Sequence, residues 1–386
     1  MKKFDCILVV THIAYRKTLP PDPIEGPYSS LCQALSSITG NVSIFGVPLV
    51  GYENALVYGL WGNTQKIQIP RFFGNWSLLK FPMDIFLSTT ALVWWSIINW
   101  NKNKLVIGIG PLSCLPLWLF KKVFGYTLVF HCVDFNKNRF NSKLLQYLYE
   151  MADEWASRFS DETWVICEAL KDYKKKWYGV SSYYIPNSVV FDPKIYKEGK
   201  IKRVGDKIVW TGSLLTNRQY DILFGVLSYI QTEVRSDIKF VIAPTKDYEK
   251  FESYAKKYKL KNMKLLKLNS RLEFQKVAAR CDVGIALYDE QFGSTEFIEP
   301  MKIWDFLLCG LPFIVSSEPS ISKPIVDSGV AYFMKPKNQI PDIRSLKLFL
   351  SKRNLLSKAR ACLVIAKNFD IERQVGIGLN RLLSKN

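Results

Sequence analysis

The chain has 386 residues, more than one domain of typical size accommodates, so we expect two domains. Hydrophobic residues make up 48% of it, which supplies enough core material to exclude a mostly disordered chain. The net charge of +19 predicts an anionic partner, and 11 Trp beside so many cations favour an anionic membrane surface over nucleic acid.

The apolar run near the start, from Cys6 to Val10, is too short for a signal peptide and predicts a first strand. Residues 85–100 are the most apolar stretch but are too short for a spanning helix. We expect a helix there that is either buried or lies in the membrane interface. Eight scattered cysteines without a CxxC pair are typical of buried thiols in the cytoplasm, not of disulfides or a metal site.

Apolar strands alternate with helical segments through the first half, which predicts a parallel sheet with helices on both faces. An apolar repeat every three or four residues predicts an amphipathic helix over 144–159. We assign residues 1–190 to a first domain, with strands expected at 4–10, 42–47, 105–109, 127–131, 163–167 and 183–185.

A charged, glycine-punctuated stretch at 194–207 breaks this pattern and marks a domain boundary. A second alternating series fills residues 200–370, with a final helix, 371–386, that can pack back on the first domain. The fold class is therefore α/β, with two Rossmann-like doubly wound domains facing across a cleft, because parallel sheets bind ligands at the carboxyl ends of their strands. The strands of this half are expected at 208–212, 239–243, 263–266, 283–288 and 313–316.

The run from Pro300 to Phe313 places a cation and a carboxylate on one helix face. Lys302 and Asp305 are spaced i,i+3, and the helix is expected to begin just after Pro300, where free N–H groups attract phosphate. Such a pair suits a nucleotide, with its diphosphate and ribose. An ordinary solvated ion pair is the alternative. In the same half, Gly212 and Ser213 form a strand-to-helix turn where the backbone can approach a phosphate closely.

The only two histidines, His12 and His131, each follow a predicted strand, and Asp134 lies three residues after the second. Imidazole or carboxylate groups at strand exits are well placed as general bases. Two structural histidines and a turn-forming Asp134 are the alternatives. The motifs GxxxxGK[ST] and HExxH are missing, as is DxD at a strand exit, so a metal site is not expected.

The second half resembles the nucleotide-sugar half of GT-B glycosyltransferases. Their pattern Pro-x-Lys-x-x-Glu-Tyr-Leu-Ala-x-Gly-x-Pro is matched here by Pro300, Lys302, Asp305, Leu307, Gly310 and Pro312. More thinly, the whole chain resembles the membrane-associated glucuronosyltransferase type of the xanthan pathway and GT4-like enzymes. The segments that carry this second resemblance are Val10 to His12, Phe130 to Asp134, and Met301 with Lys302.

The resemblance implies a donor site in the second half. Met301 and Lys302 would contact the leaving diphosphate, and Asp305 would accept hydrogen bonds from the ribose. The phosphate-facing turn would be Gly212 and Ser213, and the base would be packed by Tyr288 and Leu214.

It also implies an acceptor site in the first half, where Asp134 would deprotonate the acceptor hydroxyl and His131 is the runner-up. His12 and Arg16 would lie on the acceptor side, and Arg16 with Lys17 has exposed loop charges as the alternative. Asp305 stands in place of the usual Glu, and Phe297 stands where retaining enzymes carry a second Glu. The inverting reaction is therefore favoured.

The expected function is transfer of a sugar from a UDP-linked donor to a lipid-linked saccharide or polysaccharide precursor, without metal or cofactor. The aromatic and basic stretch from Tyr52 to Trp100 is expected to dock on the inner face of the cell membrane, with a domain core as the alternative. A GT-B-shaped nucleotide-sugar epimerase and a non-catalytic basic protein that binds membrane or nucleic acid are the competing functions.

Overall fold

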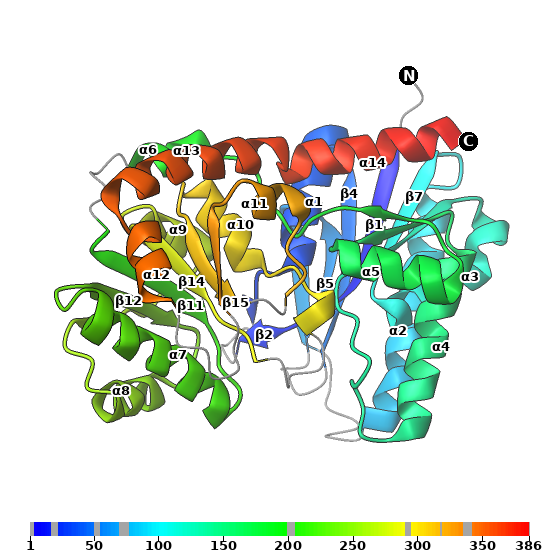
Figure 1. The fold of residues 1–386 in the computed structure, drawn as a ribbon. Helices are drawn as coiled ribbons and strands as arrows, with labels where there is room; N and C mark the ends of the chain where they lie inside the picture. The colour runs from blue at the N-terminus through cyan, green and yellow to red at the C-terminus, as the bar shows by residue number, and fades with distance from the viewer. Residues whose placement is uncertain are drawn as a thin grey trace. The chain divides into compact units, whose positions relative to one another are not determined.

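The computed structural model describes residues 4–16, 22–49, 55–68, 77–198, 205–289, 295–316, 319–334 and 342–385 (Figure 1). The chain divides into two compact units. The first unit joins Met1–Val190 to Ile371–Asn386, and the second is Phe191–Asp370. Both are α/β units built on a mainly parallel sheet, which confirms the predicted fold class.

The described sheet of the first unit has the strand order β10-β9-β8-β7-β1-β4-β5-β6. Its central strands are buried on both faces, which explains why they are continuous apolar runs. The strands are β1 (Cys6–Ile13), β4 (Val42–Pro48), β5 (Ala55–Leu60), β6 (Asn63–Gln68), β7 (Lys104–Ile109), β8 (Thr127–Cys132), β9 (Glu162–Val165) and β10 (Ser182–Tyr184). A separate small ribbon pairs β2 (Tyr15–Arg16) with β3 (Asp22–Pro23).

The hairpin of β5 and β6 corrects the expectation of a purely parallel sheet. β4, β5 and β6 pair antiparallel at the sheet edge. The residues of β5 and β6 lie in the stretch from Tyr52 to Trp100, which was expected to dock on a membrane and for which no strand was predicted. β6 is polar and largely exposed, as suits an edge strand.

Helices cover both faces of this sheet. On one face α1 (Pro27–Thr39) packs against α14 (Ile371–Lys385), the last helix of the chain. On the other face α3 (Pro111–Phe124) lies between α2 (Ser77–Ile98) and α4 (Lys143–Phe159) and contacts both. The short α5 (Glu168–Tyr173) continues into a π-helical turn, Lys174–Tyr178. Within the described ranges, no helix combines the length and apolarity that crossing a membrane requires.

The described sheet of the second unit has the order β13-β12-β11-β14-β15-β16 and is parallel throughout. Numbered within the unit, this order is 3-2-1-4-5-6, the Rossmann arrangement, with the order reversing between β11 and β14. The strands are β11 (Lys207–Gly212), β12 (Lys239–Pro244), β13 (Met263–Leu265), β14 (Val283–Ala286), β15 (Phe313–Ser316) and β16 (Ala331–Met334). The edge strand β16 was not predicted.

The helices of the second unit begin with α6 (Pro193–Glu198) and α7 (Asn217–Tyr229), whose capping box joins Thr216 and Gln219. α7 and α8 (Tyr248–Lys257) pack on one face of the sheet, and α10 (Met301–Leu308) packs on the other. On that second face, the ring of Phe306 lies so close to Gly284 that a Cβ added to Gly284 would be 2.5 Å from it. The remaining elements are a π-helical turn Ile230–Val234, α8 (Tyr248–Lys257), α9 (Arg271–Ala278), a 3-10 turn Thr295–Phe297, α10 (Met301–Leu308), α11 (Lys323–Asp327), α12 (Ile343–Phe349) and α13 (Lys352–Asn368).

Candidate functional site

Lys302 brings the start of α10 to the carboxyl end of β11. Its Nζ donates a hydrogen bond to the backbone oxygen of Thr211 at 2.7 Å, although the two residues are 91 positions apart in the chain. The same ammonium lies 5.1 Å from the ring centre of Trp210 and 5.5 Å from that of Tyr288. Burial lowers the pKa of Lys302 to about 8. A partly desolvated cation therefore sits at the point where the strand order reverses.

Gly212 makes the close approach of this ammonium possible. Its φ of 130° lies in the region that favours glycine, and a Cβ built there would come within 3.0 Å of Lys302 Nζ. The next residue, Ser213, is exposed, whereas Leu214 is buried in the core of the unit. Gly212 and Lys302 thus lie together as expected, and Ser213 can be reached from solvent, but Leu214 serves the core.

Arg218 is a further cation at this edge of the sheet, and the sequence analysis did not select it. It lies in the first turn of α7, and its Nε pairs with Asp289 Oδ1 at 3.0 Å. Asp289 directly follows Tyr288, beyond the end of β14. The available signal was a cation in the first turn of the helix that follows the glycine turn, where a helix N-terminus also attracts anions.

Asp305 does not point toward the end of β11. It is 5% exposed and accepts hydrogen bonds from Arg271 Nε at 2.8 Å and Gln275 Nε2 at 2.7 Å, both on α9. Met301, at the first position of α10, is half-buried. Spacing i,i+3 put Lys302 and Asp305 near one another along the helix, but packing turned the carboxylate onto α9. The expected ribose contact of Asp305 is therefore wrong: its carboxylate joins α10 to α9.

In the first unit, His12 lies in β1 near the point where the strand order reverses toward β7. Its Nδ1 is 3.1 Å from Ser113 Oγ on α3, and its Nε2 is 3.5 Å from Asp84 Oδ2 on α2. Asp84 is almost fully buried, and the His12 side chain is 19% exposed. Each ring nitrogen thus faces a polar group. The sequence analysis found His12 but not its two neighbours, because they come from separate helices.

His131 is a core residue of β8 rather than a strand exit. It is 3% exposed and its ring makes an edge contact with that of Trp164 at 6.2 Å. Burial lowers the pKa of His131 to about 4, so the imidazole is neutral at neutral pH. Because His131 is buried in the sheet, it does not contact a substrate in solution. The expectation that it is the second candidate for the general base is therefore wrong.

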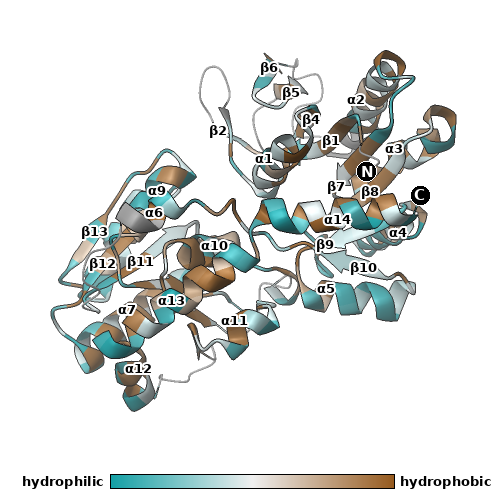
Figure 2. Ribbon diagram, turned by 90° about the horizontal axis from the view of Figure 1, so that it is seen from above, coloured by the Kyte–Doolittle hydropathy of each residue, from teal (hydrophilic) through white to brown (hydrophobic). Residues whose placement is uncertain are grey.

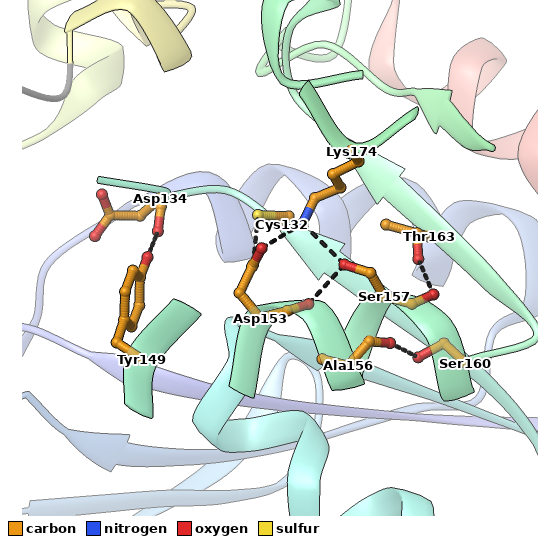
Figure 3. Close-up of polar contacts among 9 residues, drawn as sticks. All are labelled: Cys132, Asp134, Tyr149, Asp153, Ala156, Ser157, Ser160, Thr163 and Lys174. Carbon is orange, nitrogen blue, oxygen red and sulfur yellow. Dashed lines mark hydrogen bonds and ion pairs between the residues drawn. The ribbon is translucent and has the colours of Figure 1, made fainter. Parts of the chain in front are cut away.

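Asp134 lies on the loop after β8, and its side chain is 58% exposed (Figure 3). Its Oδ2 is 2.8 Å from Arg139 Nη1, while its backbone oxygen accepts a hydrogen bond from Tyr149 at 2.9 Å. The backbone is therefore held by α4 and the carboxylate is accessible. These two features are what a general base requires.

A buried ion pair lies behind this loop (Figure 3). Lys174 Nζ is 2.7 Å from Asp153 Oδ2 and 2.9 Å from Ser157 Oγ, and both ionic side chains are fully buried. Burial alone would lower the pKa of Lys174, but the Asp153 carboxylate more than offsets this, so the pKa is raised. Asp153 Oδ1 also accepts a contact from Cys132 Sγ at the end of β8. This cluster fixes the strand end from which the Asp134 loop departs.

Arg16 lies in β2, opposite Asp22 of β3. Lys17 lies outside the described residues, as do residues 52–54 and 69–76 of the stretch expected to dock on a membrane. Within the described part of that stretch, Trp61 packs on the core, Trp95 donates to Ser43, and Trp94 is exposed. The structure therefore supports neither of the two simple alternatives, because this region is part core and part exposed aromatic surface.

Comparison with protein-family models and with curated proteins found no match. Solved structures are similar. A sucrose-phosphate synthase from Thermosynechococcus elongatus has a TM-score of 0.69 at 12% identity, covering 99% of this chain and 100% of its own. An E. coli trehalose-6-phosphate protein bound to UDP-2-fluoro glucose has a TM-score of 0.64 at 12% identity, covering 97% and 98%. Anabaena HepE in complex with UDP has a TM-score of 0.60 at 12% identity, covering 97% and 100%. The chain therefore has the two-domain Rossmann-like fold of the GT-B glycosyltransferases.

Proposed function

We propose that this protein is a glycosyltransferase that transfers a sugar from a UDP-linked donor to a lipid-linked saccharide or polysaccharide precursor. The observation that carries the proposal is the Lys302 ammonium beside Gly212, at the strand-order reversal of a Rossmann sheet. The fold supports it, since structures of this fold have been solved with UDP and with a UDP-sugar.

On the donor side, the reaction must stabilise charge on the departing nucleoside diphosphate. Lys302 supplies a cation with a single hydrogen bond to a neutral carbonyl among its described contacts, and it lies in the first turn of α10, where a helix start favours anions. Arg218 lies at the same edge of the sheet, but its charge is paired with that of Asp289. A lysine and a helix start can do what a divalent metal does elsewhere, and we therefore propose a metal-independent transfer.

On the acceptor side, we assign the general base to Asp134. The acceptor oxygen forms a bond to the anomeric carbon, the bond from that carbon to the diphosphate oxygen breaks, and the acceptor proton moves to the Asp134 carboxylate. A single displacement of this kind inverts the anomeric centre. Arg139 beside the carboxylate keeps it oriented. We also assign His12 and Arg16 to the acceptor side of the same unit.

Binding of nucleotides tests the donor half of the proposal. Isothermal titration with UDP, ADP and GDP should give the tightest binding for UDP, and the Lys302→Ala variant should lose most of it. Failure of all three nucleotides to bind would refute the proposal. The same titration tests the choice of nucleotide. Binding of ADP but not UDP would keep the proposed enzyme class and change the proposed donor.

Turnover tests the acceptor half. UDP release from a panel of UDP-sugars should require a lipid-linked saccharide, which separates transfer from epimerisation. Asp134→Asn should lower turnover by about 100-fold or more while UDP affinity is kept. His12→Gln is the companion variant. Unchanged turnover in the Asp134 variant together with a large loss in the His12 variant would move the base to the imidazole that faces Asp84.

We further propose that the protein works in the cytoplasm on the inner face of the cell membrane, where lipid-linked acceptors are held. The net charge of +19 supports attraction to anionic lipids. Partition of the protein between soluble and membrane fractions at low and high salt tests this statement.

A further inference from the structure

The described part of α2 buries Asp84, Ser88 and Ser96 together with Leu92 and Trp95, and it exposes several large apolar side chains. Phe86, Trp94 and Ile98 recur at intervals of eight and four residues, so they share one helix face, and they are 64%, 67% and 60% exposed. On the inner side, Asp84 and Ser96 are buried. A surface helix in water shows the reverse pattern. In Figure 2 this helix is mostly brown and white where surface helices are usually teal.

The inward polar groups have a use, which explains the orientation of α2. Asp84 lies 3.5 Å from His12, and the last turn of the helix is held by Lys104, whose Nζ donates to the backbone oxygens of Asn99 and Trp100. The helix is therefore fixed by its polar side. The opposite side of the helix exposes the large apolar side chains of Phe86, Trp94 and Ile98. Contact with water does not favour such an apolar surface, so it calls for a partner.

The exposed apolar surface continues across α3 and α4. Leu119 and Val123 of α3 are 63% and 62% exposed, and Trp155 of α4 is 44% exposed. Aromatic contacts join the helices into one surface. The ring centre of Trp100, just after α2, is 6.1 Å from that of Phe124 on α3, and Trp118 on α3 is 4.7 Å from Phe159 on α4. We call this the α2–α4 face.

Charge distinguishes the partner of this face. Between residues 82 and 100 the one charged residue is Asp84, which is buried, so the outer side of α2 carries no acid. Exposed lysines stand next to the apolar side chains: Lys102 follows Trp100, Lys122 precedes Val123, and Lys143 precedes Leu144. Tryptophans and leucines flanked by lysines match a lipid bilayer with anionic headgroups. Glu154, beside Trp155, is paired with Arg158, so it does not offset the charge of these lysines.

We propose that the α2–α4 face docks on an anionic lipid bilayer, with Trp94 and Ile98 inserted at headgroup depth and Lys102 and Lys122 on lipid phosphates. The inference deepens the proposed function and rests on it for the location of the acceptor. It also revises the docking region, because the face includes α3 and α4 and excludes the hairpin of β5 and β6. His12 lies on the sheet side of the docked helix, one side chain away through Asp84.

Vesicle flotation tests the face. The protein should float with vesicles of phosphatidylglycerol and phosphatidylcholine and much less with phosphatidylcholine alone. Trp94→Gln/Ile98→Gln should lower the partition coefficient by about tenfold or more, and Lys102→Gln/Lys122→Gln by about fivefold per lysine at low salt. The control Leu348→Gln/Val364→Gln removes two apolar side chains of similar exposure, 66% and 59%, from the second unit and should leave partition unchanged.

Three results would overturn the inference: no flotation of the unaltered protein, equal flotation of the Trp94/Ile98 variant, or an equal loss in the control variant. A dimer in solution that the Trp94/Ile98 variant converts to a monomer, without a change in flotation, would assign the face to a second copy. UDP titration of the same samples separates the proposals. UDP binding without flotation refutes the face alone, and flotation without UDP binding refutes the donor site alone.

Discussion

Two lysines, one in each unit, show how the same side chain serves different ends. Lys174 in the first unit is fully buried and meets the carboxylate of Asp153, so its charge is neutralised within the protein. Lys302 in the second unit donates a hydrogen bond to the backbone carbonyl of Thr211, which is neutral. The pKa of Lys174 is raised, whereas burial lowers the pKa of Lys302 to about 8.

The difference indicates what each cation is for. A lysine paired with a buried carboxylate is satisfied and leaves nothing for a ligand. A lysine that lies among aromatic rings and a carbonyl at a strand end has a lowered pKa. A bound anion stabilises its protonated form and raises that pKa again. We therefore expect Lys174 to stabilise the fold and Lys302 to bind the ligand. The predictions below test this contrast from the largest effect to the smallest.

Lys174→Ala should lower the free energy of unfolding by about 3–5 kcal/mol, because it leaves the Asp153 carboxylate buried without a counter-charge. Urea unfolding followed by circular dichroism measures it. The control is Lys171→Ala, which breaks an exposed pair with Glu168 at 3.1 Å and should cost about 0–1 kcal/mol. The double variant Lys174→Met/Asp153→Leu should recover much of the loss. Equal costs for the two single variants would remove the contrast between buried and exposed lysines.

Lys302→Ala should weaken UDP binding by about 30- to 100-fold, the equivalent of about 2–3 kcal/mol of charge-assisted hydrogen bonding. Stability should change little, since no carboxylate loses a partner among the described contacts of this lysine. Titration calorimetry gives the affinity, and Lys347→Ala on the exposed side of α12 serves as the control. An unchanged UDP affinity in the Lys302 variant would show that Lys302 does not bind the nucleotide.

Gly212→Ala should weaken UDP binding by about tenfold. The added Cβ would stand 3.0 Å from Lys302 Nζ, and the φ of 130° would strain an alanine by about 1–3 kcal/mol. Gly225→Ala is the matched control, because its Cβ would meet the Tyr258 ring at 3.7 Å, an ordinary contact. Calorimetry of both variants decides whether the effect belongs to the position of the ammonium. Similar affinities in both variants would contradict the close fit at Gly212.

UDP affinity should fall as the pH rises through about 8, because Lys302 then loses the proton that gives it charge. Below that pH the ammonium is charged and binding is fully present; above it, affinity should drop by at most about tenfold per pH unit. Bound diphosphate raises the pKa of Lys302, so the affinity stops falling once the pH exceeds that raised value. Lys302→Arg stays cationic throughout and should give a flat profile. Parallel profiles for both proteins would assign the titration to another group.

Local sequence patterns were enough to place most elements of the fold. The helix after Pro300 and the strand from Phe313 to Ser316 were predicted where α10 and β15 lie, because proline, glycine and apolar periodicity act within a few residues. β16 and the hairpin of β5 and β6 were missed. β16 is a short edge strand and β6 a polar one, and β5 is held in the sheet by its antiparallel pairing with β4 and β6.

The candidate site divides in the same way. Lys302, Gly212 and His12 were selected because charge, glycine and histidine at strand exits are visible in the sequence. The turn of Asp305 onto Arg271, the burial of His131 and the place of Arg218 were not visible. Each depends on which helix packs beside which strand, and the spacing of residues along the chain does not predict this packing.

By itself, the sequence determined two alternating α/β halves, a basic and aromatic character, and a lysine at the start of one short helix. These follow from composition and from contacts within a few residues. The tertiary structure alone decided that Lys302 meets Thr211 while Asp305 meets α9, and that α2 turns its apolar side outward. Such choices are made by residues many positions apart that compete for the same space, and only the packed chain resolves that competition.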